Sequence, residues 1–236
     1  MLNFLVKLFS GKPDQPRLST DTSPNGQAPG NTVLKYYLYL SQTKVDMLFP
    51  QVPADFLKGA EAEIKVNLGL ASAALKSRSP EDAKELAGRA AAVCSYIRRH
   101  DEVGDVSLPK RWIAGTAMLQ WGIVTEYASD IVFFGGKVAE KNLALLGSRE
   151  SLIGEAKTAE ANHAPFYYTL KFFNQIVARN DMGKNVQPPY LSYQKDIEIA
   201  LQALPKTMTN VEFLAKVLHD EPTCLVATPL YVAIVD

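Results

Sequence analysis

The pattern of apolar and polar positions predicts a strand, and the point where it ends, near the start of the predicted domain. Residues 35–40, KYYLYL, have the period of two that predicts a β-strand. The predicted faces alternate, with Tyr36, Leu38 and Leu40 on one face and Tyr37 and Tyr39 on the other. A polar group at residues 41–44 follows, and an apolar element resumes at Val45. Polar side chains at a strand end are well placed to line a ligand site, so this boundary is the first candidate position.

The same patterns predict further strands. Alternation, β-branched residues and aromatic residues indicate strands at 63–70 (extending toward Leu75), 112–124, 130–134, 143–146 and 224–235. Gly135 and Gly136 are expected to break the third of these, with residues 137–142 as a hairpin connection. Pro229 predicts a bulge or an edge position in the last strand.

Helices are predicted between these strands, at residues 79–99, 164–178, 192–204 and 209–218. The first has Ser79 as its N-cap and Pro80 at its first helical position. The last depends on the run Thr209-Asn210-Val211-Glu212, which matches a capping box. Strands and helices interleave without regular strand-helix alternation, which favours a single α+β domain with a mixed or largely antiparallel sheet.

The chain is expected to have three parts: an apolar segment at residues 1–10, a Pro/Gly-rich linker at 11–32 and the domain at 33–236. The first segment is too short to span a bilayer. Its apolar face is predicted to dock on a partner or on the domain itself, through Leu2, Leu5, Val6 and Phe9. Contact with a membrane surface is the weaker alternative, because Lys7 is the segment's single cation.

Composition narrows the functional classes. Lys plus Arg and Asp plus Glu each number 25, so no net field attracts nucleic acid, and no nucleic-acid partner is predicted. The two cysteines have no CxxC spacing, and they predict a reducing, cytoplasmic setting. The histidines lie far apart in the sequence, so we predict neither a metal site nor a cofactor.

Two short stretches carry the candidate ligand-binding residues. The first is the strand end, with Ser41, Thr43, Lys44 and Asp46. The alternative there is a capped helix start, in which Ser41 or Thr43 satisfies backbone N–H groups and Lys44 is solvated. The second is the turn with Gly147, Ser148 and Arg149, which is suited to an anion such as phosphate. The alternative there is an ordinary strand-end turn, because no GxGxxG or Walker pattern is present.

The blocks YYLYLSQTKVDMLFPQVP, EIKVNLGL, VFFGG, LLGS, NVEFLAKVL and LVATPLYVAIVD resemble an uncharacterised bacterial family of the actinomycete type, a domain of unknown function. The resemblance covers residues 34–236 and implies no activity. The chain departs from the family pattern by its N-terminal segment and linker, and by Leu146 where relatives carry an extra glycine. This bulkier residue weakens the case for a phosphate loop.

Three functional hypotheses follow. The leading one is a non-catalytic module that binds a small ligand or a protein partner, with a sensor in a bacterial signalling or defence system as one form of it. The second is a hydrolase of phosphorylated or nucleotide-like molecules, which requires Lys44, Asp46, Ser148, Arg149 and His163 to meet in one pocket. The third is an assembly subunit docked through residues 1–10.

Overall fold

The structure is a computed structural model that describes residues 35–59, 80–153, 171–176 and 193–235. The elements, in chain order, are β1 (Tyr36–Leu40), α1 (Gln42–Leu48), η1 (Phe49–Gln51), α3 (Pro80–His100), β2 (Val103–Gly104), β3 (Trp112–Ile123), β4 (Ile131–Val138), β5 (Lys141–Ser148), η2 (Arg149–Ser151), α5 (Tyr193–Ala203), β6 (Thr209–Asp220) and β7 (Cys224–Ile234). Residues 54–59 and 171–176 are also helical.

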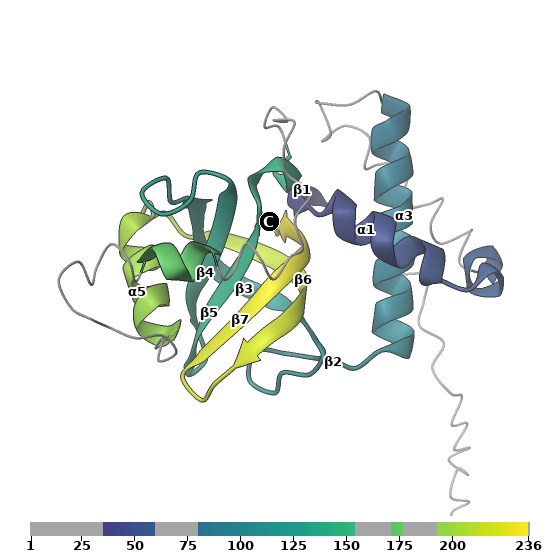
Figure 1. Cartoon of the computed structure of the whole chain (residues 1–236). Helices are drawn as coiled ribbons and strands as arrows, with labels where there is room; N and C mark the ends of the chain where they lie inside the picture. The colour runs from purple at the N-terminus through teal and green to yellow at the C-terminus, as the bar shows by residue number, and fades with distance from the viewer. Residues whose placement is uncertain (1–34, 60–79, 154–170, 177–192, 236) are drawn as a thin grey trace, which may run out of the picture. The chain divides into compact units, whose positions relative to one another are not determined.

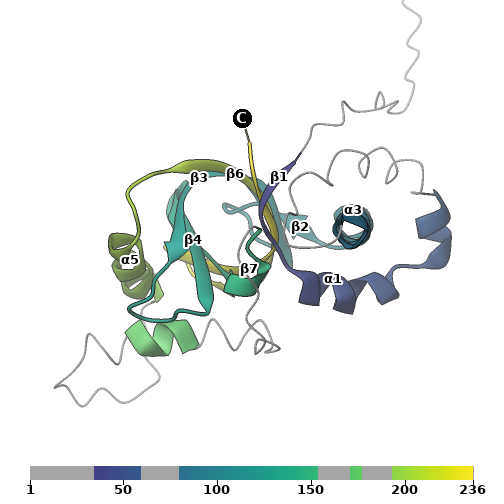
Figure 2. The ribbon, with the colours of Figure 1, turned by 90° about the horizontal axis from the view of Figure 1, so that it is seen from above.

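Five strands close into a barrel in the order β7-β5-β4-β3-β6, with β6 returning to β7 (Figures 1 and 2). Neighbouring barrel strands are antiparallel except β5 and β7, which are parallel. Outside this ring, β1 pairs antiparallel with β7, and β2 pairs parallel with β3. The prediction of a single α+β domain with a mixed sheet is confirmed.

The barrel interior is an apolar core to which every barrel strand contributes. Its buried side chains include Ile113, Phe134, Leu145, Phe213 and Val232, one from each strand. The alternate side chains point outward, because successive residues of a strand face opposite sides of the sheet. The outer face therefore needs its own covering layer wherever its side chains are apolar.

Helices cover the outer face in two separate regions (Figure 2). The helices α1 and α3 pack on the region that contains Trp112 and Leu214. The helix α5 and residues 171–176 pack on the region that contains Phe133 and Leu146. The strand β7 contributes to both regions, so it runs beneath the boundary between the two helical layers.

The prediction of a helix at residues 209–218 is wrong, because the segment is strand β6. Its apolar run also fits a period of two, with Val211, Phe213 and Ala215 inside the barrel and Leu214 outside. Pairing with β3 on one side and β7 on the other satisfies its backbone along most of its length. Tertiary pairing overrides the capping-box signal here.

The predicted strand break at Gly135 and Gly136 is also wrong, because β4 continues to Val138. The chain turns instead at Ala139, which has a φ of 52°. A Cβ on Gly135 would lie 2.6 Å from the ring of Phe133, so the glycine makes room for a core side chain rather than for a turn.

The strand β1 does not keep the simple alternation predicted for it. A β-bulge lies between Tyr37 and Tyr39. As a result Leu38 and Tyr39 pack against the barrel interior, whereas Tyr37 and Leu40 pack against the outer core with α3.

Other predicted elements agree with the structure where it describes them. The helix α3, the strands β3, β5 and β7, and the helix α5 lie where the patterns indicate. A register shift near Pro229 confirms the predicted bulge in β7. The predictions for residues 1–10, 11–32 and 63–70, and those for Ser79 and His163, lie outside the described residues.

Candidate functional site

The candidate site lies where β7 changes neighbours along one edge. The strand β5 pairs with this edge up to Leu145 opposite Ala227, and β1 takes over from Leu40 opposite Tyr231. Along this edge, residues 228–230 of β7 pair with neither β5 nor β1. The opposite edge of β7 pairs with β6 through this region. We call this gap, with the residues that border it, the β7 fork.

Two groups from the start of α1 occupy the β7 fork. The backbone N–H of Ser41 donates to the carbonyl oxygen of Leu230 at 2.9 Å. The Lys44 ammonium Nζ donates to the carbonyl oxygen of Pro229 at 3.0 Å. These bonds replace the ladder bonds that a neighbouring strand would make, because buried backbone carbonyls need donors.

Local sequence explains how Lys44 reaches the fork. Ser41 is the N-cap of α1, and its Oγ accepts from the backbone N–H of Lys44 at 3.4 Å. The Lys44 Nζ lies at the same 3.4 Å from this Oγ, so the side chain folds back over the helix start. The capped helix start expected as the alternative is present. The solvated lysine expected with it is wrong, because Lys44 is only 7% exposed.

Burial controls the charge of Lys44. Loss of hydration lowers its pKa from 10.5 to about 7. Both acceptors of its Nζ, Ser41 Oγ and Pro229 O, are neutral, and no described carboxylate pairs with it. Ammonium groups that are nearly fully buried are rare in proteins unless they are paired. Lys44 is therefore an unusual group at a defined break in the sheet.

A second polar group adjoins the fork. The Thr228 side chain is 1% exposed, and its Oγ1 has no hydrogen-bond partner among the described residues. Its register partner Lys216 is exposed, so both side chains lie on the outer face of the barrel. Most buried hydroxyls have a partner, so an unpartnered one next to Pro229 marks the fork as a place that can accept a further polar group.

The second predicted stretch reaches the fork through Tyr39. The Tyr39 ring lies 6.0 Å from the Nζ of Lys44. A Cβ on Gly147 would lie only 2.4 Å from the Tyr39 hydroxyl, so the glycine lets β5 and β1 approach each other. Gly147 and Lys44 thus have Tyr39 as a common neighbour.

The other predicted site residues have local roles. Ser148 caps η2, with its Oγ accepting from the backbone N–H of Glu150 at 3.3 Å. The backbone N–H of Arg149 donates to the carbonyl oxygen of Asp130. Thr43 is exposed, and the Asp46 carboxylate pairs with Arg89 of α3 at 2.9 Å. Asp46 therefore joins α1 to α3 instead of pairing with Lys44.

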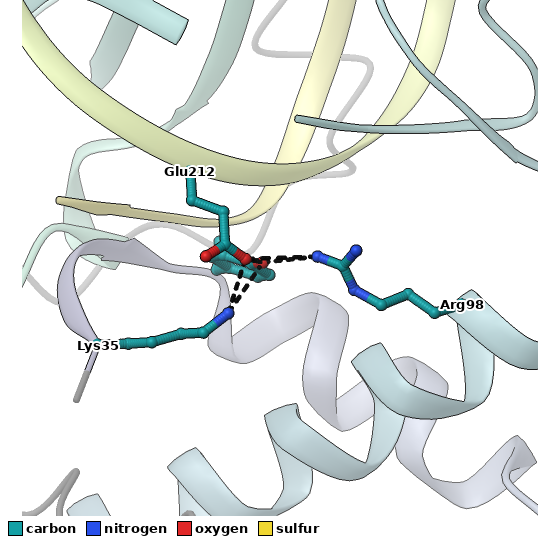
Figure 3. A network of polar contacts seen from close by, with 4 residues as sticks. Lys35, Arg98 and Glu212 are labelled. Carbon is teal, nitrogen blue, oxygen red and sulfur yellow. Dashed lines mark hydrogen bonds and ion pairs between the residues drawn. The ribbon is translucent and has the colours of Figure 1, made fainter. Parts of the chain in front are cut away.

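Sequence reasoning missed a polar network on the other side of β1 (Figure 3). The Glu212 carboxylate of β6 accepts from Lys35 Nζ at 2.7 Å, from Arg98 of α3 at 3.4 Å and from the Tyr231 hydroxyl. Arg98 also donates to the Tyr231 hydroxyl at 2.9 Å. These residues are far apart in the sequence, and no local pattern connects them. The network ties the start of β1 and the end of α3 to the barrel.

The charges of this network are stable near neutral pH. Burial raises the pKa of Glu212, but the hydrogen bonds from Lys35 and Tyr231 and the positive charges of Lys35 and Arg98 outweigh burial and lower the pKa overall. Burial, the nearby Cys94 and Glu212 raise the pKa of Tyr231. The carboxylate thus stays charged and the phenol stays neutral, which suits a structural clamp better than a proton donor or acceptor.

A third cluster brings a thiol, a carboxylate and an imidazole together. Glu221 contacts His219 Nε2 at 2.7 Å through one oxygen and accepts from Cys224 Sγ at 3.3 Å through the other. Burial, followed by the hydrogen bond to Glu221, raises the pKa of Cys224 to about 12. A nucleophilic cysteine needs a base or a positive charge beside its sulfur, whereas here a carboxylate takes that place.

Within the described ranges, no cluster of three or more His, Cys, Asp or Glu side chains is arranged to hold a metal ion. No helix in the described part of the chain is long and apolar enough to cross a membrane.

A protein family of unknown function (DUF7019) matches residues 35–236. The match begins at the residue before β1 and extends to the end of the chain. No curated protein and no solved structure matches the chain significantly.

Proposed function

The chain belongs to this family of unknown function, and we propose that it is a non-catalytic module that binds a small ligand at the β7 fork. The observation that carries this proposal is Lys44, a nearly fully buried lysine whose hydrogen-bond acceptors are both neutral. An ammonium has three donors, and two acceptors are present here. A ligand oxygen from a carbonyl or carboxylate group would satisfy the third donor.

The competing explanation is purely structural. In that view Lys44 only closes the gap in the ladder by donating to Pro229. A neutral amide such as glutamine also donates to a carbonyl, without the cost of burying a charge. The ionisable amine that contacts Pro229 O, and the unpartnered hydroxyl of the preceding residue Thr228, support ligand recognition.

The setting of the module is part of the proposal. A cytoplasmic location is supported by Cys94 and Cys224, which are both free thiols. A sensor role is compatible with the fork, because α1 carries Lys44 and is joined to α3 through Asp46 and Arg89. A ligand that moves Lys44 would therefore act on the helical layer that packs on the barrel.

A ligand screen with matched variants tests this function. Thermal unfolding of the full chain is measured with a panel of metabolites that carry carboxylate or carbonyl groups. A ligand at about 100 times its Kd adds about 2.7 kcal/mol to the stability of the folded state.

The variant Lys44→Met should lose the ligand-induced shift. The control Lys58→Met should keep it, because Lys58 is 81% exposed and lies on the separate helical segment at residues 54–59. Equal shifts in the wild-type protein and Lys44→Met would place the ligand elsewhere and refute the proposed site.

A further inference from the structure

The chemistry of the β7 fork points to one class of ligand. We propose that Lys44 binds its ligand as a reversible Schiff base, and that the ligand is a small aldehyde or ketone. This inference depends on the proposed function, because it names the ligand class of the same site. It concerns covalent binding without turnover.

The surroundings of Nζ favour a free amine over an ammonium. A neighbouring carboxylate would hold the lysine in its charged form, but the one on the same helix, Asp46, pairs with Arg89. Among the described residues, Nζ contacts the Ser41 hydroxyl, the Pro229 carbonyl and, at 6.0 Å, the Tyr39 ring. None of these groups is a carboxylate.

Desolvation also favours the free, reactive amine. With its pKa at about 7, about half of Lys44 is unprotonated at neutral pH. For an ordinary exposed lysine the corresponding fraction is about one in 3,000. Only the unprotonated amine has the lone pair that attacks a carbonyl carbon, and desolvation is an established way of activating lysine for this reaction.

The fork supplies the groups that the reaction requires. The Nζ lone pair attacks the carbonyl carbon, a C–N bond forms, and the carbonyl π electrons move to oxygen. A proton passes from nitrogen to that oxygen, and the Ser41 hydroxyl at 3.4 Å from Nζ is placed to relay it. This gives a carbinolamine with one remaining N–H. The second proton from nitrogen then passes to the hydroxyl group, the C–O bond breaks as water leaves, and the nitrogen lone pair forms the C=N bond.

The reaction balances as amine plus carbonyl compound giving imine plus water, so it needs no oxidant or reductant. When the imine is protonated, it keeps one N–H, which continues to donate to Pro229 O. The unpartnered Thr228 hydroxyl offers a hydrogen bond to a polar group of the ligand.

The other polar clusters of the described chain do not offer this chemistry. Lys35 and Arg98 already share the Glu212 carboxylate as ion-pair partners. The Cys224 thiol donates to Glu221 and is held protonated by burial. Lys44 is therefore the amine best placed to react.

Reductive trapping tests the inference on the full wild-type chain. The protein is incubated at neutral pH with a small aldehyde, propionaldehyde, and in a parallel sample with the anionic aldehyde glyoxylate. Cyanoborohydride reduces any imine to a stable secondary amine, and peptide mass spectrometry then locates and times each modification. We expect Lys44 to be modified at least 10-fold faster than the exposed Lys58. Modification of Lys44 at the same rate as Lys58, or not at all, overturns the inference.

Two variants test the roles of the Lys44 amine and the Ser41 hydroxyl in the reaction. Lys44→Met should remove the fast adduct while leaving the slow one on Lys58. Ser41→Ala should slow adduct formation at Lys44 if the hydroxyl relays the proton. An unchanged rate in Ser41→Ala overturns the relay step.

The dependence on pH distinguishes this inference from the proposed function. Imine formation should accelerate as the pH rises through about 7, because the free amine increases. An anionic ligand held only by the ammonium should instead bind more weakly over the same range. A Lys44-dependent thermal shift that weakens above this pH, without a trapped adduct, overturns the Schiff base and leaves the binding site standing. The opposite outcome is a fast adduct on Lys44 together with metabolite-induced thermal shifts that persist in Lys44→Met. It would refute the proposed function and support the reactive amine.

Discussion

Replacing Lys44 with methionine should change how the stability of this protein depends on pH. Methionine is unbranched and apolar, so it fills the space of the lysine stem without a charge. The substitution also removes the donor to Pro229 O, at a cost of about 1 kcal/mol that does not vary with pH. The pH-dependent part of the change therefore reports on the Lys44 charge alone.

The magnitude follows from the lowered pKa. Folding moves the pKa of Lys44 from 10.5 to about 7, and at about 1.36 kcal/mol per pKa unit this difference is worth about 5 kcal/mol. Below about pH 7 both states bind the proton, and the folded state bears the full cost of burying it. Between about pH 7 and the unfolded pKa, the unfolded chain binds more protons, so stability rises with pH.

Urea unfolding of the wild-type protein and Lys44→Met at about pH 7 and about pH 9 measures this difference. The wild-type protein should gain about 2 kcal/mol more than the variant over this interval. Other titrating groups are common to both proteins and cancel in the comparison. Lys58→Met serves as the control, because it removes a lysine that is 81% exposed and leaves the β7 fork intact.

Parallel pH profiles for the wild-type protein and Lys44→Met would refute the reasoning. They would show that Lys44 keeps the same proton affinity in the folded and unfolded states, through solvent access or through pairing with an anion. In either case the neutral amine at the β7 fork, and the reactivity inferred from it, would be lost.

Three further predictions concern other contacts of the barrel and its helices. Glu212→Gln should destabilise the protein by about 1–3 kcal/mol in urea unfolding at neutral pH, because the network loses its only anion; an unchanged midpoint would show that the clamp contributes nothing. Gly147→Ala should cost about 1–3 kcal/mol, because the new methyl group overlaps a buried phenol, whereas Gly59→Ala meets nothing within 4 Å and should cost little; equal midpoints would contradict the close approach of β5 and β1. Cys94 and Cys224 should react with a thiol reagent at mildly alkaline pH only after unfolding, because burial raises the pKa of each thiol to about 12; fast labelling of the folded chain would contradict this.

Much of the fold is predictable from local sequence. The helix α3 follows from a proline at its first position and an apolar stripe, and β3, β5 and β7 follow from β-branched and aromatic runs. These features act within a few residues of one another, so their effect does not depend on distant neighbours. The segment at residues 209–220 differs because its apolar run fits both a helix and a strand. Only pairing with β3 and β7 decides between them.

The candidate site likewise combines features set by local sequence with features set by tertiary packing. The sequence identified Ser41 as a helix cap and grouped it with Lys44, because capping is a local interaction. It could not show that Lys44 is buried, since that burial depends on β5 and β1 leaving a gap along β7. The Glu212 network likewise depends on Lys35 and on residues of α3, β6 and β7, which meet only in the folded chain. Tertiary structure thus decided the charge and the partners of these side chains, because hydration is lost only where separate elements pack together.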